Sequence, residues 1–236
     1  MKTLAILMAN TDVSDFADKH PKDGEKFTQL INGVRPDWRC DVFDVVQSVF
    51  PVNLEKYDGF LITGSPASVH DGAKWIEKLE RFVRDIRAQN IPLFGACFGH
   101  QIIAKALGGA VGKNPDGFVF GTVISNNTSD CSWTDQLPDE FPLYAAHLEQ
   151  VTILPEGAKR VAQSAACLNA GYIIGDTVYT TQYHPEMTPL FIEALTLHLS
   201  NKFDPEVIKA AQDSLKSNVD RNVFAETVAQ FFEFQS

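Results

Sequence analysis

The chain has 236 residues, of which 44% are apolar, and its 20 basic and 30 acidic side chains give a net charge of −10. This composition excludes extensive disorder, and the length favours one domain with a large core over residues 1–236. An acidic chain lacks the cationic surface that nucleic acids require. No apolar run approaches the roughly 18 residues of a membrane span. The four cysteines show no C-x-x-C spacing, so we expect free thiols and a cytoplasmic protein.

The first half of the chain alternates strand-like and helix-like segments. Short apolar or alternating runs predict strands at Thr3–Ala9, Cys40–Val46, Tyr57–Thr63 and Ile91–Gly95. Apolar residues at three- and four-residue intervals predict helices over 21–34, Gly72–Ala88 and Phe98–Leu107. Strands separated by helices pair in parallel with right-handed crossovers. We therefore expect an open α/β sheet flanked by helices, with its ligand site at the carboxyl ends of the strands.

The second half changes character after residue 110. Runs divided by Gly, Pro, Asn and Asp predict added antiparallel strands at Val119–Ser125, Gln150–Leu154, Arg160–Ala166, Ala170–Gly175 and Thr177–Gln182. Helices are expected at 188–199, Asp204–Ser217 and Arg221–Phe234, the second with Asp204 as N-cap. We place the core of the domain at about 1–200 and a helical extension at 201–236. The extension either packs onto its own domain or forms a dimer or partner surface.

The segment from Ile91 to Gly109, IPLFGACFGHQIIAKALGG, contains a G-x-C-x-G pattern at 95–99. This is the thiol counterpart of the nucleophile elbow, in which glycines let the chain turn tightly from a strand into a helix. The helix N-terminus favours a thiolate at Cys97 and leaves the Phe98 N–H free for an oxyanion. The turn would expose the sulfur above the sheet. Alternatively, Cys97 is a buried structural residue and the glycines only turn the chain.

A second segment, YTTQYHPE at 179–186, places a histidine and a carboxylate just after a predicted strand. A cysteine nucleophile needs a base to take its proton, and the base needs a third group to orient it. His184 and Glu186 supply both, and Pro185 restricts the backbone between them. Taken alone, the same three residues are more typical of a surface turn.

These segments together resemble a known family, the class I glutamine amidotransferases with a Cys-His-Glu triad. The matching motifs are G-A-C-F-G-H-Q (95–101), A-L-G-G (106–109), Q-Y-H-P-E (182–186) and T-G-S-P-A-S-V (63–69). The resemblance covers about residues 1–200 and implies a flavodoxin-like, mostly parallel sheet. It also implies that Cys97 is the nucleophile, His184 the base and Glu186 its orienter, with Gly64 and Phe98 as oxyanion donors.

The same resemblance implies four substrate contacts, by Ser65, Gln101, His147 and Glu149. Ser65 belongs to the oxyanion loop, and Gln101 follows the cysteine by one helical turn. His147 and Glu149 occupy a segment similar to the family's H-x-D-x-V, with Glu149 where aspartate is usual. A polar strand end is the alternative explanation for these last two residues.

The implied chemistry is acyl transfer to water through a γ-glutamyl thioester, which needs no metal or organic cofactor. The elbow C-F-G-H-Q is more similar to stand-alone members, including plant γ-glutamyl peptidases, and this favours a free-standing hydrolase. The alternative is a glutaminase that delivers ammonia to a separate synthetase, similar to the amidotransferase half of GMP synthase. The chain has no P-loop with which to activate an acceptor itself. A third possibility is a catalytically silent binding or regulatory protein, and a homodimer is possible in each case.

Overall fold

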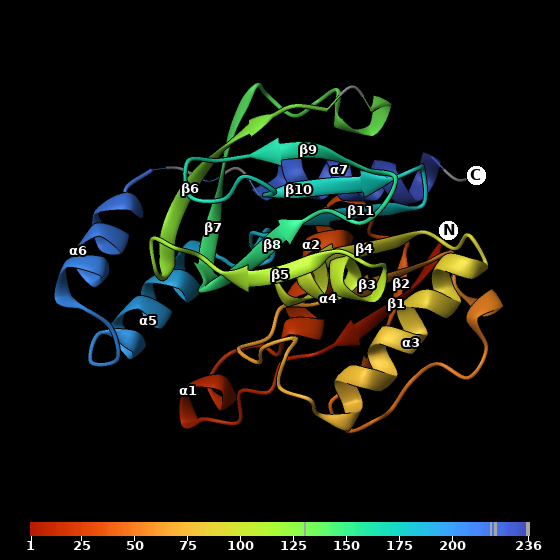
Figure 1. Cartoon of the computed structure of the whole chain (residues 1–236), viewed down its shortest axis with the longest axis horizontal. Coiled ribbons are helices and arrows are strands. Elements are labelled where there is room, and N and C mark those ends of the chain that lie inside the picture. Colours follow the sequence, from red (N-terminus) through yellow and green to blue (C-terminus); the bar gives the residue numbers. More distant parts are fainter. Residues whose placement is uncertain (130, 218, 220, 235–236) are drawn as a thin grey trace.

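The computed structural model describes residues 1–129, 131–217, 219 and 221–234, so part of the expected extension at 218, 220, 235 and 236 lies outside the described residues. A nine-stranded sheet forms the centre of the molecule (Figure 1). In spatial order its strands are β2 (Arg39–Asp44), β1 (Thr3–Met8), β3 (Gly59–Ile62), β4 (Leu93–Ala96), β11 (Val178–Thr181), β10 (Gly171–Ile174), β9 (Ala158–Gln163), β6 (Val119–Asn127) and β7 (Glu140–His147). The first five are parallel to one another and the remaining pairings are antiparallel. The fold is therefore the expected open, mostly parallel α/β sheet with added antiparallel strands.

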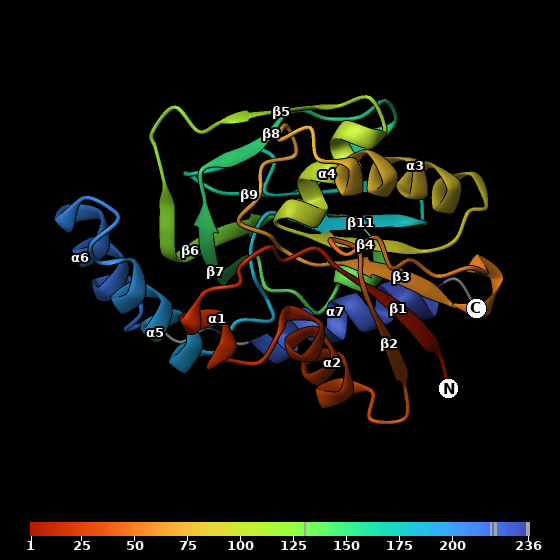
Figure 2. The same ribbon diagram turned by 90° about the horizontal axis from the view of Figure 1, so that it is seen from below.

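Helices cover both faces of the parallel half of the sheet (Figure 2). Helices α3 (Lys74–Ala88) and α4 (Phe98–Ala106) lie on one face, and α2 (Asp23–Val34) and α7 (Arg221–Phe234) lie on the other. The remaining elements are α1 (Asp15–Asp18), α5 (Pro189–Leu199), α6 (Pro205–Ser214), the 3-10 turns Leu54–Lys56 and Ser132–Thr134, and a separate antiparallel pair of β5 (Ala110–Lys113) with β8 (Glu149–Ile153). None of the helices among the described residues has the length and apolar character needed to cross a bilayer.

Alternation along the central strands divides the core into two layers. In β1, Leu4 and Ile6 pack with α2 and α7, whereas Ala5 and Leu7 pack with α3 and α4. All four are fully buried. A strand buried on both faces reads as a continuous apolar run, which explains the TLAILM segment. The carboxyl ends of β3, β4 and β11 consequently meet at one edge of the sheet.

Strand β5 was not predicted, and two features of the antiparallel half of the central sheet also differ from the sequence-based expectation. Strand β7 was not predicted, because Pro142 interrupts its apolar run. A proline is tolerated at position 142 because β7 is the last strand of the sheet, where one row of N–H groups has no ladder partner. Strand β11 was expected to be antiparallel, and it is antiparallel to β10 but parallel to β4. This pairing places the end of β11 beside the end of β4.

The C-terminal helices pack onto their own domain. Phe224, Phe231 and Phe232 of α7 are at most 2% exposed and lie in the same core layer as α2. Helix α6 begins as expected, since Asp204 accepts a hydrogen bond from the Glu206 N–H at 2.8 Å. The hydroxyl of Ser214, at the end of α6, accepts a 2.8 Å bond from the Thr122 N–H of β6. For α7, these contacts favour internal packing over the dimer-surface alternative.

Candidate active site

The turn between β4 and α4 carries Cys97 in an unusual backbone conformation. Its φ of 51° and ψ of −106° are values that residues other than glycine rarely adopt. Neighbouring chain explains the glycines on either side. A Cβ at Gly99 would collide with the carbonyl oxygen of Ile62 on β3, and one at Gly95 would lie 2.6 Å from Ile103 Cδ1. The G-x-C-x-G pattern is thus required by close packing of the turn, and strain of this kind is common at functional sites.

Cys97 is more enclosed than the sequence suggested. The residue is only 5% exposed, so the expectation of a sulfur projecting freely above the sheet is wrong. Gly64 at the end of β3 closes over it: a Cβ at this position would lie 3.7 Å from Cys97 Cβ and 2.9 Å from His184 Cε1. Gly64 therefore lies close to both side chains, and the structure brings these three predicted residues together.

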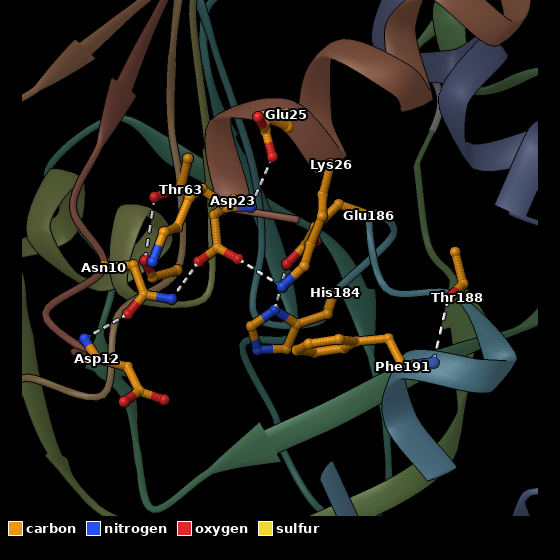
Figure 3. Close-up of polar contacts among 12 residues, drawn as sticks. Asn10, Asp12, Asp23, Glu25, Lys26, Thr63, His184, Glu186, Thr188 and Phe191 are labelled. Carbon is orange, nitrogen blue, oxygen red and sulfur yellow. Dashed lines mark hydrogen bonds and ion pairs between the residues drawn. The ribbon is translucent and has the colours of Figure 1, made fainter. Parts of the chain in front are cut away.

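His184 and Glu186 form a buried pair directly after β11 (Figure 3). His184 Nδ1 donates to Glu186 Oε1 at 2.7 Å, and both side chains are at most 6% exposed. The backbone N–H of His184 donates to the Tyr144 carbonyl of β7 at 2.8 Å, which anchors the histidine to the far edge of the sheet. A carboxylate on Nδ1 fixes the ring and leaves Nε2 available for proton exchange.

The charge balance around His184 favours its protonated form. Burial lowers the pKa of the imidazole, but the Glu186 carboxylate and the Cys97 sulfur outweigh burial and raise the pKa well above its usual range. Among the described residues His184 Nε2 is buried outside normal hydrogen-bond geometry, and the nearby Cys97 sulfur raises the pKa of His184 both through its charge and as a hydrogen-bond partner. Such contacts commonly tighten when substrate binds. The arrangement suits an imidazolium at His184 beside the Cys97 sulfur.

The two predicted oxyanion donors both lie next to Cys97, Phe98 as the following residue and Gly64 in the loop after β3. Phe98 is the first residue of α4, so its N–H has no partner within the helix. Gly64 is held by its neighbour Thr63, whose hydroxyl donates to the Gly64 carbonyl and accepts from the Ala9 N–H, both at 3.0 Å. The bond between the Ala9 N–H and the Thr63 hydroxyl ties the loop after β3 to the end of β1. The backbone on both sides of Cys97 is therefore fixed.

A chain of two buried amides leads from β8 to the sulfur. The carbonyl of Glu149 can only accept, so Gln101 turns its NH₂ group toward it at 2.7 Å. The other Gln101 N–H donates to Gln182 Oε1 at 3.2 Å, which leaves the Gln182 NH₂ group facing Cys97 Sγ at 3.7 Å. Both N–H groups of Gln101 are used, and only its oxygen remains for a substrate.

Gln182 is a site residue that the sequence analysis did not single out. It lies two positions before His184 at the end of β11, and residues two apart on a strand share a face. That spacing was a usable signal, because a polar residue on the same face as the base must point toward the same space. The side chain is fully buried.

The other predicted substrate residues line the neighbouring loop and strands. The Ser65 hydroxyl is half-buried and accepts from the Ala67 N–H at 3.1 Å. His147 donates from Nδ1 to the Glu149 carbonyl at 3.1 Å, and burial lowers the pKa of His147 to about 4. The Glu149 carboxylate accepts from the Ser68 hydroxyl at 2.7 Å. Glu149 therefore ties β8 to the loop that carries Gly64.

A second polar cluster lies behind Glu186 (Figure 3). Lys26 Nζ donates to Asp23 at 2.8 Å and lies 3.5 Å from the centre of the Phe191 ring, while Asn10 donates to the other Asp23 oxygen at 2.7 Å. Lys26, Phe191 and Glu186 line a cavity of about 120 Å³. Glu186 Oε2 is buried without a partner among the described residues, and the cavity has room for waters beside it. The part of the chain that the structure describes contains no group of three or more His, Cys, Asp or Glu suited to hold a metal ion.

Comparison with known proteins places this geometry in context. The family model "Glutamine amidotransferase class-I" matches residues 34–193. The chain is 34% identical over 194 residues to gamma-glutamyl peptidase 3 of Arabidopsis thaliana, covering 78% of this chain and 77% of that one. It is 32% identical over 145 residues to a subunit of the glutamine-hydrolysing GMP synthase of Archaeoglobus fulgidus, covering 61% and 74%. A solved glutamine amidotransferase from Thermotoga maritima shares the fold, with a TM-score of 0.77, 21% identity and coverage of 98% and 97%.

Proposed function

The chain belongs to the class I glutamine amidotransferases, and we propose that it hydrolyses a γ-glutamyl amide bond through a thioester on Cys97. Its family and its relatives make it an enzyme of the hydrolase or amidotransferase type. The bond that breaks joins the γ-carbonyl of a glutamyl group to an amine. Gamma-glutamyl peptidases among the relatives support a free-standing enzyme that acts on γ-glutamyl compounds.

In the proposed reaction the Cys97 thiolate attacks the γ-carbonyl carbon. The N–H groups of Gly64 and Phe98 stabilise the tetrahedral oxyanion, and the His184 imidazolium protonates the departing amine. The neutral imidazole then takes a proton from water, which hydrolyses the thioester and regenerates the thiolate. Glu186 keeps His184 in the required tautomer and stabilises its charge through both steps.

One observation carries this proposal: the buried 2.7 Å contact between His184 Nδ1 and Glu186, beside a cysteine on a strained strand-to-helix turn. A surface turn would not bury a histidine and a carboxylate at this depth. A purely structural cysteine has no need of a strained φ of 51°. The geometry therefore favours a nucleophile with its base.

The test is amine or ammonia release by the purified chain. Glutamine and a panel of γ-glutamyl amides and peptides are the substrates, and Cys97→Ala is the control. We expect turnover of at least one γ-glutamyl compound, lost in Cys97→Ala, and a mass increase on Cys97 when the thioester is trapped by acid quench. No turnover and no trapped thioester, with a folded protein, would favour a silent binding protein instead.

A second function is favoured by the GMP synthase relative from Archaeoglobus fulgidus. In that case the chain is a glutaminase that delivers ammonia to a separate synthetase. Glutaminase activity would then be low in the isolated chain and rise when the partner is added. A glutamine-like electrophile would still label Cys97 in the isolated chain, which distinguishes this case from a silent protein.

A further inference from the structure

The turn that carries the His-Pro-Glu sequence is held from outside the segment that the family model matches. Arg221 is the first residue of α7, well beyond residue 193 where that match ends. Its Nε donates to the Pro185 carbonyl and its Nη2 to the Glu186 carbonyl, both at 2.9 Å. The planar guanidinium thus spans two consecutive peptide groups, a geometry that a lysine ammonium does not reproduce.

The turn has few other restraints at these two positions. Pro185 has no N–H, and none of the described backbone N–H groups donates to the carbonyl of residue 185 or 186. Upstream, His184 is anchored through its own N–H to Tyr144. Downstream, the chain enters α5 at Pro189. Between these points, Arg221 is the group that fixes the orientation of the peptide carrying the Glu186 side chain.

Helix α7 gives Arg221 a rigid base. Phe231 and Phe232 are fully buried in the core layer shared with α2. At the same time Arg35, the residue after α2, binds Glu226 of α7 at 2.7 Å and Glu233 at 2.6 Å. Loss of the Arg221 side chain would leave these anchors intact. Its effect would therefore fall on the turn rather than on the position of the helix.

We propose that Arg221 is a positioning residue that fixes the Glu186–His184 pair, so that the C-terminal extension completes the catalytic machinery. The guanidinium also interacts electrostatically with Glu186, which adds to its control of the carboxylate. The proposal rests on the proposed function, since it needs His184 to act as the base for Cys97. A one-ångström displacement of such a pair costs about 100-fold in rate.

The experiment compares Arg221→Gln and Arg221→Lys with Arg35→Gln. Arg35→Gln is a matched control, because it removes an arginine that binds α7 from the end of α2 and does not touch the turn. For each variant the melting temperature, kcat/KM and the pH dependence of Cys97 alkylation by iodoacetamide are measured. We expect Arg221→Gln to lower kcat/KM about 100-fold and to move the alkylation midpoint to higher pH. Arg221→Lys should recover only part of the activity.

Arg35→Gln should melt earlier but keep the wild-type alkylation profile. A folded Arg221→Gln protein with unchanged turnover and profile would overturn the proposal. If Arg221→Gln does not fold, Arg221→Lys decides: a wild-type profile counts against the proposal and a shifted one supports it. Failure of the proposed function has a different signature. The wild-type protein would then turn over no substrate, and Cys97→Ala would be alkylated to the same extent as the wild type.

Discussion

The two turns that form the site are held in different ways. The cysteine turn between β4 and α4 is fixed by close packing. The absence of a Cβ leaves room for the Ile103 side chain at Gly95 and for the backbone of Ile62 at Gly99. The histidine turn after β11 depends on remote groups: Tyr144 lies 40 residues before His184, and Arg221 follows Glu186 by 35. Cys97 is thus positioned mainly by steric packing around the glycines of its own turn, and His184 and Glu186 by hydrogen bonds from other elements. Substitutions in the two turns should fail in different ways.

The largest effect should come from Glu186→Gln in the histidine turn. The amide is close in size but carries no charge and can present its NH₂ group to His184, which favours the wrong tautomer. Loss of the orienting carboxylate in a triad lowers kcat about 10⁴-fold. Steady-state kinetics on the γ-glutamyl compound that the turnover assay identifies measure this loss. Glu193→Gln on the exposed side of α5 is the control, and a fall of less than tenfold in Glu186→Gln would contradict the assigned role.

Acidification should also change the free energy of unfolding, with a sign that depends on the surroundings of each histidine. Burial lowers the pKa of His147 to about 4 and that of His100 to about 3. The unfolded chain, in which histidine has a pKa near 6.5, therefore binds more protons below that pH. The contribution of these residues to the free energy of unfolding is complete above about pH 6.5 and falls as the pH drops toward 4. His184, whose pKa is raised, acts in the opposite sense, and its contribution is lost at high pH.

For His147 the loss in free energy of unfolding is on the order of 3 kcal/mol once the pH has fallen from above 6.5 to below about 4. Urea unfolding at a series of pH values between 7 and 4.5 measures the slope. We expect His147→Gln to flatten it, whatever its effect on stability at neutral pH. An unchanged slope would show that His147 is not held neutral in the folded protein.

The sequence predicted the cysteine turn well because the glycines that its packing requires stand in the turn itself. The glycines that avoid a steric clash stand two residues before and two residues after Cys97, and they are visible in G-A-C-F-G itself. His184 and Glu186 were also predictable, since they follow a strand and are separated by one proline. Arg221 was not, because a basic residue at the start of a helix carries no sign of the carbonyls it will meet. Strand β7 was missed for a related reason: Pro142 is acceptable only at an edge, and edges are a property of the whole sheet.

A steric test of the local turn is Gly99→Ala. Its Cβ would meet the Ile62 carbonyl, which belongs to the sheet and cannot move away like a flexible side chain. We expect a loss of about 1–3 kcal/mol in unfolding free energy, measured by urea titration. Gly33→Ala on α2 is the matched control, since a Cβ there meets nothing within 4 Å. That control should gain about 0.5–1 kcal/mol from its helical position. Equal stability of the two variants would show that the β3–α4 contact is looser than described.

The smallest effect should come from Gln182→Met. Gln182 precedes the histidine turn, and its NH₂ group faces Cys97 in the other turn. Methionine keeps the length of the side chain but removes the N–H that faces the sulfur at 3.7 Å. A hydrogen bond to a charged group contributes about 1.5–3 kcal/mol, and the long distance favours the lower limit, so we expect about a tenfold fall in kcat/KM. The pair Gln101→Met and Gln182→Met forms a double-mutant cycle. Because Gln101 orients Gln182 through a 3.2 Å bond, the double variant should lose less than the product of the single losses. Independent effects would mean that Gln101 acts on the substrate directly and that the amide chain does not couple β8 to the nucleophile.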